Sequence, residues 1–352
     1  MRRWTRELVA IDSVTGREGE LARWLQNELP TRGWNVRPLS VTADGGRLNL
    51  MCTFESEVPS ILFNTHLDTV PDAYGPREDS ERLFGRGACD TKGILAAMLE
   101  ALEQARDDGV KGLGLLLVVG EEFDHVGAKH AGENLPEPDV LIVGEPTENK
   151  FLLSQKGLLT AQMFASGSEG HSGYPERSDS AVEKLLPALE ALRTAPWLGR
   201  TSEEGTTLNI SMLQGGDAYN KVAGEASAAL MYRLDIPATD VILHANELLQ
   251  PWTADGGVRV DWHQAYSCDP MHGLDHLPDH PCSVAAFGTD LPFFRWQPRR
   301  KYLVGPGSIH QAHRDVIGGD WMGGEWMEKS SQEDGARLYL ELIKRNAEWL
   351  AC

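Results

Sequence analysis

The sequence predicts an α/β fold with a mostly parallel sheet, interrupted by a separate α+β unit. Three nearly continuous apolar runs, at 60–64, 112–119 and 140–143, are typical of strands that are buried on both faces. A helical pattern at 90–106 separates the first two runs, as expected of parallel strands joined by a crossover helix. Its apolar face contains Ile94, Leu95, Met98, Leu99 and Leu102.

The flanking segments complete this expected domain. Before the first run we expect two helices and a strand, because apolar residues recur at helical spacing from Leu21 to Leu29. Near the C-terminus, Leu303 and Val304 indicate another strand, and 331–350 indicates a closing amphipathic helix. Ser330 or Ser331 is the expected cap of that helix, with Glu333 and Asp334 near its positive end.

From about residue 157 the pattern changes. Strands are expected at 158–165, 207–214, 226–234 and 258–262, and helices at 180–193 and 239–249. We therefore predict a discontinuous domain of residues 1–156 and 267–352, with 157–266 as an inserted domain.

Composition narrows the functional classes. The 352 residues suggest two domains. With 33 basic and 52 acidic residues the net charge is −19, which disfavours nucleic acids and anionic membranes as partners. No apolar stretch is long enough to span a membrane, and the start lacks the apolar region of a secretory signal. Five cysteines without a CxxC motif favour a reduced, cytoplasmic protein, so metal ligands would be His, Asp and Glu.

Polar residues that suit metal chemistry stand where the predicted strands end, and one stands where the helix begins. They are His66, Asp68, Asp90, Glu121, Glu122 and Glu145. In open α/β sheets, ligands bind at the carboxyl ends of strands, so these residues are expected to converge. In extended chain His66 and Asp68 would point the same way, which lets Asp68 support a metal-binding His66. Glu121 and Glu122 would point in opposite directions and take different roles.

Each residue alone also has an ordinary structural explanation. A glutamate pair after a strand is usually solvated, and an aspartate before a helix is usually an N-cap. The ordered set, rather than any single member, favours a functional site.

Five segments resemble a known family in the same order. They read NTHLDTVP at 64–71, GRGACDTKG at 85–93, EE at 121–122, GEPT at 144–147 and GPGSIHQAH at 305–313. They resemble the acetylornithine deacetylase/succinyl-diaminopimelate desuccinylase family of dinuclear zinc metallohydrolases, which includes glutamate carboxypeptidases and aminoacylases. The resemblance implies a zinc-exopeptidase-like catalytic domain and an inserted lid and dimerisation domain.

The resemblance also implies a role for each residue. His66 and Glu145 would bind one metal, Glu122 and His313 the other, and Asp90 would bridge both. Glu121 would be the general base, and Asp68 would orient His66. The implied cofactor is two Zn²⁺, with Co²⁺ or Mn²⁺ as possible substitutes.

The inserted segment carries further resemblance. GSEGHSGYP at 167–175 is similar to the family's lid motif, whose histidine, here His171, reaches the partner subunit's active site and stabilises the oxyanion. Asn220 and Arg233 are candidates to bind the substrate's α-carboxylate, for which the arginine fork is suited. A homodimer is implied.

Three features of the sequence do not follow directly from the family resemblance. After His313 the family usually has an acidic pair within a few residues, whereas this chain continues RDVIGGD. His310 is expected to line the pocket or support it. His272, His276 and His280 are expected in a solvated loop, because Pro278 and Pro281 interrupt the helix that would align them.

The resulting functional prediction is a metal-dependent amidohydrolase that removes an N-acyl group, most simply acetyl, from an amino acid such as ornithine. The 305–313 segment resembles the acetylornithine deacetylase branch, which acts in arginine biosynthesis. The alternatives are a succinyl-diaminopimelate desuccinylase, a carrier-linked lysine or ornithine hydrolase and a dipeptidase. An alternative of another class is a non-catalytic amino-acid-binding protein.

Overall fold

The computed structural model describes residues 2–55, 58–201, 203–317 and 319–352. Its backbone contacts divide the chain into two compact units. The first contains 1–153, 273–283 and 289–352, and the second contains 154–272 and 284–288. These bounds differ by a few residues from the predicted domains, whose separate roles remain predictions.

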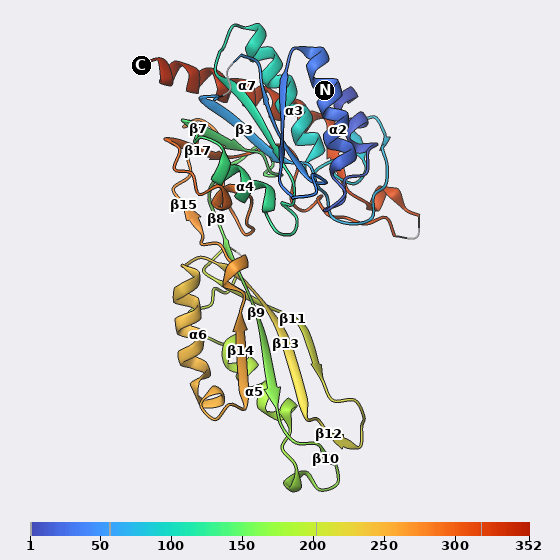
Figure 1. Cartoon of the computed structure of the whole chain (residues 1–352), viewed down its shortest axis with the longest axis vertical. Helices are drawn as coiled ribbons and strands as arrows, with labels where there is room; N and C mark the ends of the chain where they lie inside the picture. The colour runs from blue at the N-terminus through green and yellow to red at the C-terminus, as the bar shows by residue number, and fades with distance from the viewer. Residues whose placement is uncertain (1, 56–57, 202, 318) are drawn as a thin grey trace. The chain divides into compact units, whose positions relative to one another are not determined.

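The first unit is built around a six-stranded sheet, seen in the upper part of Figure 1. In spatial order its strands are β1 (Asn35–Ser40), β2 (Leu48–Thr53), β6 (Leu113–Val118), β3 (Ile61–His66), β7 (Val140–Val143) and β17 (Arg300–Leu303). The last four are mutually parallel, whereas β2 runs antiparallel to both of its neighbours, β1 and β6. The predicted α/β class with a mostly parallel sheet is confirmed, because four of its six strands run parallel. As expected from their apolar runs, β3, β6 and β7 are buried along their whole lengths.

Helices of the first unit complete its apolar core. They are α1 (Arg2–Val9), α2 (Gly19–Glu28), α3 (Lys92–Asp107), α4 (Val126–Asn134) and α7 (Lys329–Ala351). The buried α3 packs against α1 and α7. The core cluster joins these helices to the sheet.

The predicted cap of the last helix is wrong. The helix begins at Lys329, its N-cap is Glu328, and no side chain caps it. The Ser331 hydroxyl instead accepts a hydrogen bond from the Gly307 amide at 3.0 Å.

A small antiparallel sheet pairs residues from distant parts of the first unit. In it β5 (Arg82–Phe84) lies between β4 (Arg77–Glu78) and β18 (Trp326–Glu328). The register pairs Trp326 with Phe84, so the chain before β18 is brought beside Gly85.

The second unit is an α+β layer. Its sheet order is β11 (Thr207–Gly215), β13 (Glu225–Leu234), β9 (Gly157–Ser166) and β14 (Val258–Trp262), all antiparallel. Helices α5 (Ala181–Arg193) and α6 (Ala238–Thr253) pack against β9, whose residues alternate between buried and half-buried. A two-stranded sheet of β10 (Gly170–His171) and β12 (Lys221–Val222) belongs to the same unit. A third sheet has the order β15 (Met271–His272), β8 (Phe151–Gln155) and β16 (Cys282–Ala285), and its strands β8 and β16 contain residues of both units. Among the described residues, no helix is both long enough and apolar enough to cross a membrane.

Candidate metal centre and active site

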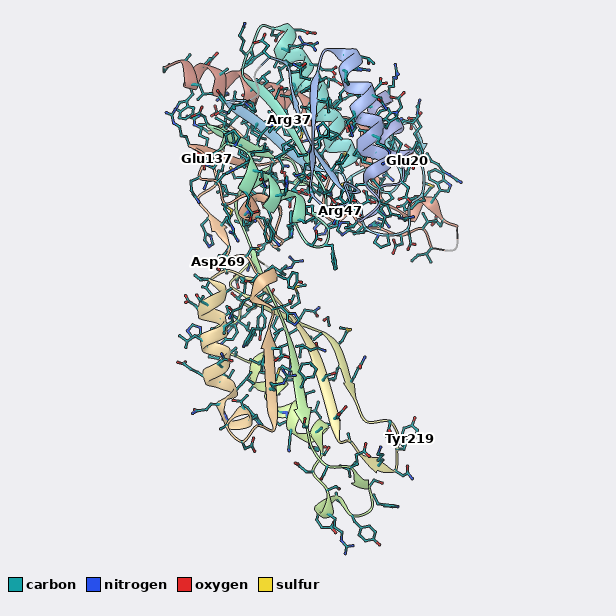
Figure 2. The ribbon with its side chains drawn as sticks, viewed as in Figure 1. Glu20, Arg37, Arg47, Glu137, Tyr219 and Asp269 are labelled. Atoms are coloured by element: carbon teal, nitrogen blue, oxygen red, sulfur yellow. The ribbon has the colours of Figure 1, made fainter. Side chains whose placement is uncertain are left out.

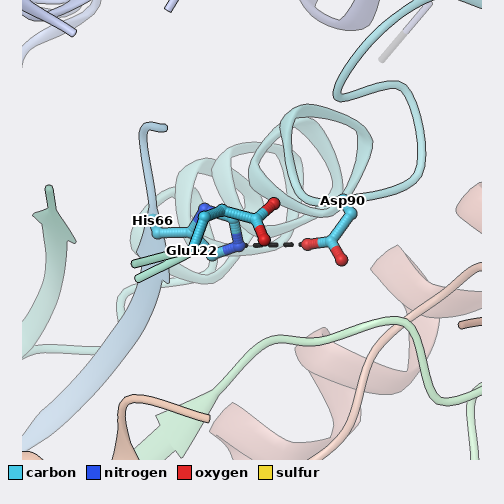
Figure 3. A group of neighbouring side chains, drawn as sticks. All are labelled: His66, Asp90 and Glu122. Atoms are coloured by element: carbon cyan, nitrogen blue, oxygen red, sulfur yellow. Dashed lines mark hydrogen bonds and ion pairs between the residues drawn. The ribbon is translucent and has the colours of Figure 1, made fainter. Parts of the chain in front are cut away.

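His66 is the last residue of β3, and its buried imidazole contacts polar atoms at both nitrogens. Nδ1 lies 2.9 Å from the backbone oxygen of Asp68, and Nε2 lies 3.0 Å from Oδ1 of Asp90. Figure 3 shows this contact, with the Glu122 carboxylate beside the ring. The contact of Nδ1 with the Asp68 backbone fixes the orientation of the ring, so that Nε2 points toward the Asp90 carboxylate.

Asp90 does not cap the helix that follows it. The N-cap of α3 is Thr91, and no side chain makes a capping hydrogen bond there. The Asp90 carboxylate lies between two imidazoles, since its Oδ2 is 3.3 Å from Nε2 of His313. This position suits a ligand shared between two cations.

Glu122 and His313 complete the cluster. Nε2 of His313 lies 3.0 Å from Oε1 of Glu122. One ligand atom each from His66, Asp90 and Glu122 lies within 4.8 Å of the others, the spacing of groups that hold one ion. The structure therefore brings together four of the five predicted metal ligands through direct contacts.

The two glutamates lie on a turn rather than on extended chain. Asp68 accepts the backbone amides of this turn. Its Oδ1 lies 2.8 Å from the Gly120 nitrogen and 3.1 Å from that of Glu121, and its Oδ2 lies 3.2 Å from that of Glu122. The Asp68 side chain therefore supports this turn, in addition to its expected support of His66. The sequence pattern did not indicate its contacts with the turn.

Arg47, which is labelled in Figure 2, contacts the same turn through Asp124. Its guanidinium binds both carboxylate oxygens of buried Glu18, at 2.6 and 3.2 Å, and lies 3.4 Å from Asp124. Asn49 accepts the Val119 amide at 3.2 Å.

The ionised forms of the three glutamates of the cluster are disfavoured by burial and by neighbouring carboxylates, whereas contacts with His66 and His313 outweigh the burial of Asp90 and lower its pKa. Burial, and then the charge of Glu145, raise the pKa of Glu121 well above its usual range. Burial and Asp90 similarly raise the pKa of Glu145, and burial raises the pKa of Glu122. Glu145 belongs to the same cluster of interacting charges, because its charge raises the pKa of Glu121.

The histidines respond in the opposite direction. Hydrogen bonds that the imidazole of His313 donates to the carboxylates of Asp90 and Glu122 raise the pKa of His313 to about 10. Burial lowers the pKa of His66, but contacts with Asp68 and Asp90 outweigh it and raise that pKa overall. The cluster carries excess negative charge, and its imidazole and carboxylate groups are ligands that suit divalent cations. Bound cations would replace the protons that these groups otherwise hold.

The predicted residues of the second unit lie on and around its strands. The Gly173 amide donates to Nδ1 of exposed His171 at 3.0 Å, so the neutral ring carries its proton on Nε2. The Ser172 amide donates to the backbone oxygen of Asn220. Arg233 lies on β13 between buried Tyr232 and Leu234, on the opposite face of the sheet from their side chains.

The remaining histidines stand apart from this cluster. His310 is exposed, as is His272, and His280 forms an ion pair with Glu341 at 3.3 Å. Within the described ranges, His66, Asp90 and Glu122 form the single group with metal-ligand spacing. Sequence reasoning missed Glu325, whose carboxylate accepts the Asp90 amide at 3.0 Å. No local motif marks it, because it follows His313 by twelve residues.

The fold and this cluster fit the class of metal-dependent hydrolases. Residues 62–345 match Peptidase family M20/M25/M40. The chain belongs to this family and is therefore a hydrolase of amide or peptide bonds.

Relatives agree with this assignment over most of the chain. A protein of Aspergillus clavatus named "probable carboxypeptidase" is 35% identical, covering 89% of this chain and 77% of its own. A "peptidase M20 domain-containing protein" of Schizosaccharomyces pombe is 31% identical, covering 88% and 77%.

Solved structures share the fold. A tripeptidase from Staphylococcus aureus has a TM-score of 0.80 at 23% identity, covering 99% of this chain and 98% of its own. An M20 family metallo-carboxypeptidase from Sulfolobus solfataricus has a TM-score of 0.72 at 16% identity, covering 97% of each chain. A Bacillus subtilis protein described as a dinuclear metal-binding peptidase has a TM-score of 0.65 at 11% identity, covering 99% and 97%.

Proposed function

We propose that this protein hydrolyses the amide bond of an N-acyl amino acid and releases the free amino acid. The observation that carries the proposal is the contact of Asp90 with both His66 and His313, beside Glu122. His66 and Glu145 would hold one divalent cation, Glu122 and His313 a second, with Asp90 between them. Zinc is the proposed metal, and cobalt or manganese would substitute. The two cations would supply Lewis-acid chemistry, polarising the amide carbonyl and acidifying the attacking water.

The residues of the chain provide the proton transfers and the orientation. Glu121 would accept the proton of the attacking water and deliver it to the leaving amine. Asp68 would keep Glu121 in place through the amides of the turn.

The second unit would bind the rest of the substrate. Arg233 and Asn220 are proposed to bind the α-carboxylate, and His171 to donate from Nε2 to the oxyanion. We propose that His171 acts in the partner subunit of a homodimer. Strand β11 lies at one end of its sheet, with Met212 59% and Leu213 55% exposed, which supports its pairing with another chain.

Acetyl is the proposed acyl group, with N-acetylornithine as the first substrate to test. A second candidate is release of a C-terminal amino acid from a dipeptide or short peptide, since the relatives are named probable carboxypeptidases. Both reactions cleave an amide next to an α-carboxylate.

A substrate panel tests the proposal. Purified protein with Zn²⁺ or Co²⁺ is assayed with acetyl, succinyl and aminoacyl derivatives of the same set of amino acids. Metal-dependent release of the amino acid from an acetyl derivative supports the proposal. Hydrolysis of dipeptides alone would favour the second candidate, and no hydrolysis of any substrate would favour a binding protein.

A further inference from the structure

Outside the proposed ligands, the first unit contains a buried ion pair between Arg86 and Glu325. Arg86 is 2% exposed and Glu325 0%. Nη1 of Arg86 donates to Oε2 of Glu325 at 3.0 Å, and Nε donates to the backbone oxygen of Pro71 at 3.0 Å. Nη2 pairs with Asp315, so the arginine joins three separate segments.

The second oxygen of Glu325 reaches the metal-site backbone. Oε1 accepts the amides of Cys89 at 2.9 Å and Asp90 at 3.0 Å. One carboxylate therefore binds the guanidinium on one side and the main chain of a proposed metal ligand on the other. Any shift of Glu325 would move the backbone from which the Asp90 side chain projects.

The other end of the network meets the loop that follows His313. Asp315 lies two residues after that histidine, and the Tyr74 hydroxyl donates to the backbone oxygen of Arg314 at 2.7 Å. The Glu325 amide donates to the same Tyr74 oxygen. The loop is thus attached to the Arg86–Glu325 pair through both a side chain and its backbone.

Strand pairing explains how a residue so far along the chain arrives here. Strand β18 pairs with β5, and the Gly85 amide donates to the Glu325 backbone oxygen at 3.1 Å. Trp321 packs edge-on against Phe84, with ring centroids 4.8 Å apart. The described residues 314–317 and 319–324 therefore leave the His313 region and return beside the segment that leads to Asp90.

We propose that Arg86 and Glu325 are positioning residues that set the metal affinity of the site by fixing Asp90 and the His313 loop together. This inference rests on the proposed metal centre. Metal sites need ligands held to within about 0.5 Å, and loss of a supporting partner typically costs about 10- to 100-fold in metal affinity. A buried ion pair is itself weak evidence for stability, since apolar residues often replace one without loss.

The test measures Co²⁺ binding by the full-length protein after metal removal, by titration against a competing chelator and by the visible spectrum of bound Co²⁺. Glu325→Ala removes the acceptor of both amides and should raise the dissociation constant about 10- to 100-fold and alter the spectrum. Glu325→Gln keeps one oxygen for those amides, so its dissociation constant should fall between those of the wild type and the alanine variant.

Glu103→Gln is the matched control. Glu103 pairs with Arg32 at 3.3 Å and accepts the Trp34 indole N–H at 3.2 Å, near the end of α3 that is remote from Asp90. The Glu103→Gln change weakens a charged pair that is less buried than Arg86–Glu325 and does not contact Asp90, so it should leave the Co²⁺ dissociation constant and spectrum unchanged.

The outcomes separate this inference from the proposed function. If the wild type binds no Co²⁺, the metal centre itself is refuted and the inference fails with it. If the wild type binds Co²⁺ and Glu325→Ala binds it within twofold, only the inference is overturned. An equal loss of affinity in Glu103→Gln would also overturn it. If Glu325→Ala does not fold, Glu325→Gln decides: a rise of about fivefold or more supports the inference, and none overturns it.

Discussion

Replacing Asp68 by asparagine is expected to loosen the turn that carries Glu121 and Glu122. The carboxylate accepts two amides at Oδ1, from Gly120 and Glu121, whereas Oδ2 accepts the Glu122 amide and the Thr15 hydroxyl. Asparagine keeps only one acceptor oxygen. In the more favourable of its two orientations, asparagine keeps the two hydrogen bonds from the Gly120 and Glu121 amides at Oδ1. Its NH₂ group then faces the Glu122 N–H, which has no acceptor.

The cost follows from these contacts. An unsatisfied buried amide costs about 1–3 kcal/mol, and the retained bonds lose the extra strength of a charged acceptor. We expect the free energy of unfolding to fall by about 3 kcal/mol in total, and kcat to fall by at least about tenfold because Glu122 is displaced.

Denaturant unfolding followed by tryptophan fluorescence gives the first quantity, and steady-state hydrolysis of the best substrate gives the second. Thr15→Val is the control, because it removes only the hydroxyl bond and should cost about 1 kcal/mol. Unfolding within about 1 kcal/mol of wild type, together with kcat within about twofold, would refute the proposed role of Asp68.

Three further predictions follow from the proposed function. Chelator treatment should abolish hydrolysis and added Zn²⁺ or Co²⁺ should restore it; full activity in a sample shown to be metal-free would exclude the metal mechanism. Arg233→Ala should reduce kcat/KM about 100-fold, the scale of a charged hydrogen bond, and less for substrates with an amidated carboxylate; equal losses for both substrates would indicate a structural role. Glu121→Gln and His171→Ala should each be nearly inactive, whereas randomly reassembled mixtures should recover about a quarter of wild-type activity, because half the dimers then contain one intact site. Proven subunit exchange without recovery would place His171 outside the partner's site.

Much of the first unit was predictable because its strands are buried on both faces. Continuous apolar runs revealed β3, β6 and β7, whose ends then indicated where polar side chains meet. His66 ends β3 and Asp90 lies just before α3, 24 positions later, and their convergence was expected because ligands bind at the edge of the sheet where its parallel strands end. The chemical roles of these residues remain predictions.

Other features depend on contacts that no local pattern encodes. Glu121 and Glu122 lie on a turn instead of the extended chain that the sequence suggested, because their backbone amides donate hydrogen bonds to the Asp68 carboxylate. The Ser331 hydroxyl accepts a hydrogen bond from the Gly307 amide rather than capping α7. Glu325 reaches Asp90 only through the pairing of β18 with β5.

The most direct test of the central claim is the turnover of Glu121→Gln with its metal content measured in the same sample. Glutamine preserves the size and polarity of the side chain but cannot accept the proton of the attacking water. We expect a kcat at least about 100-fold below wild type, the usual scale for a lost general base, at unchanged metal content. Near-normal turnover in the fully metallated variant would contradict the account and place the base at another residue.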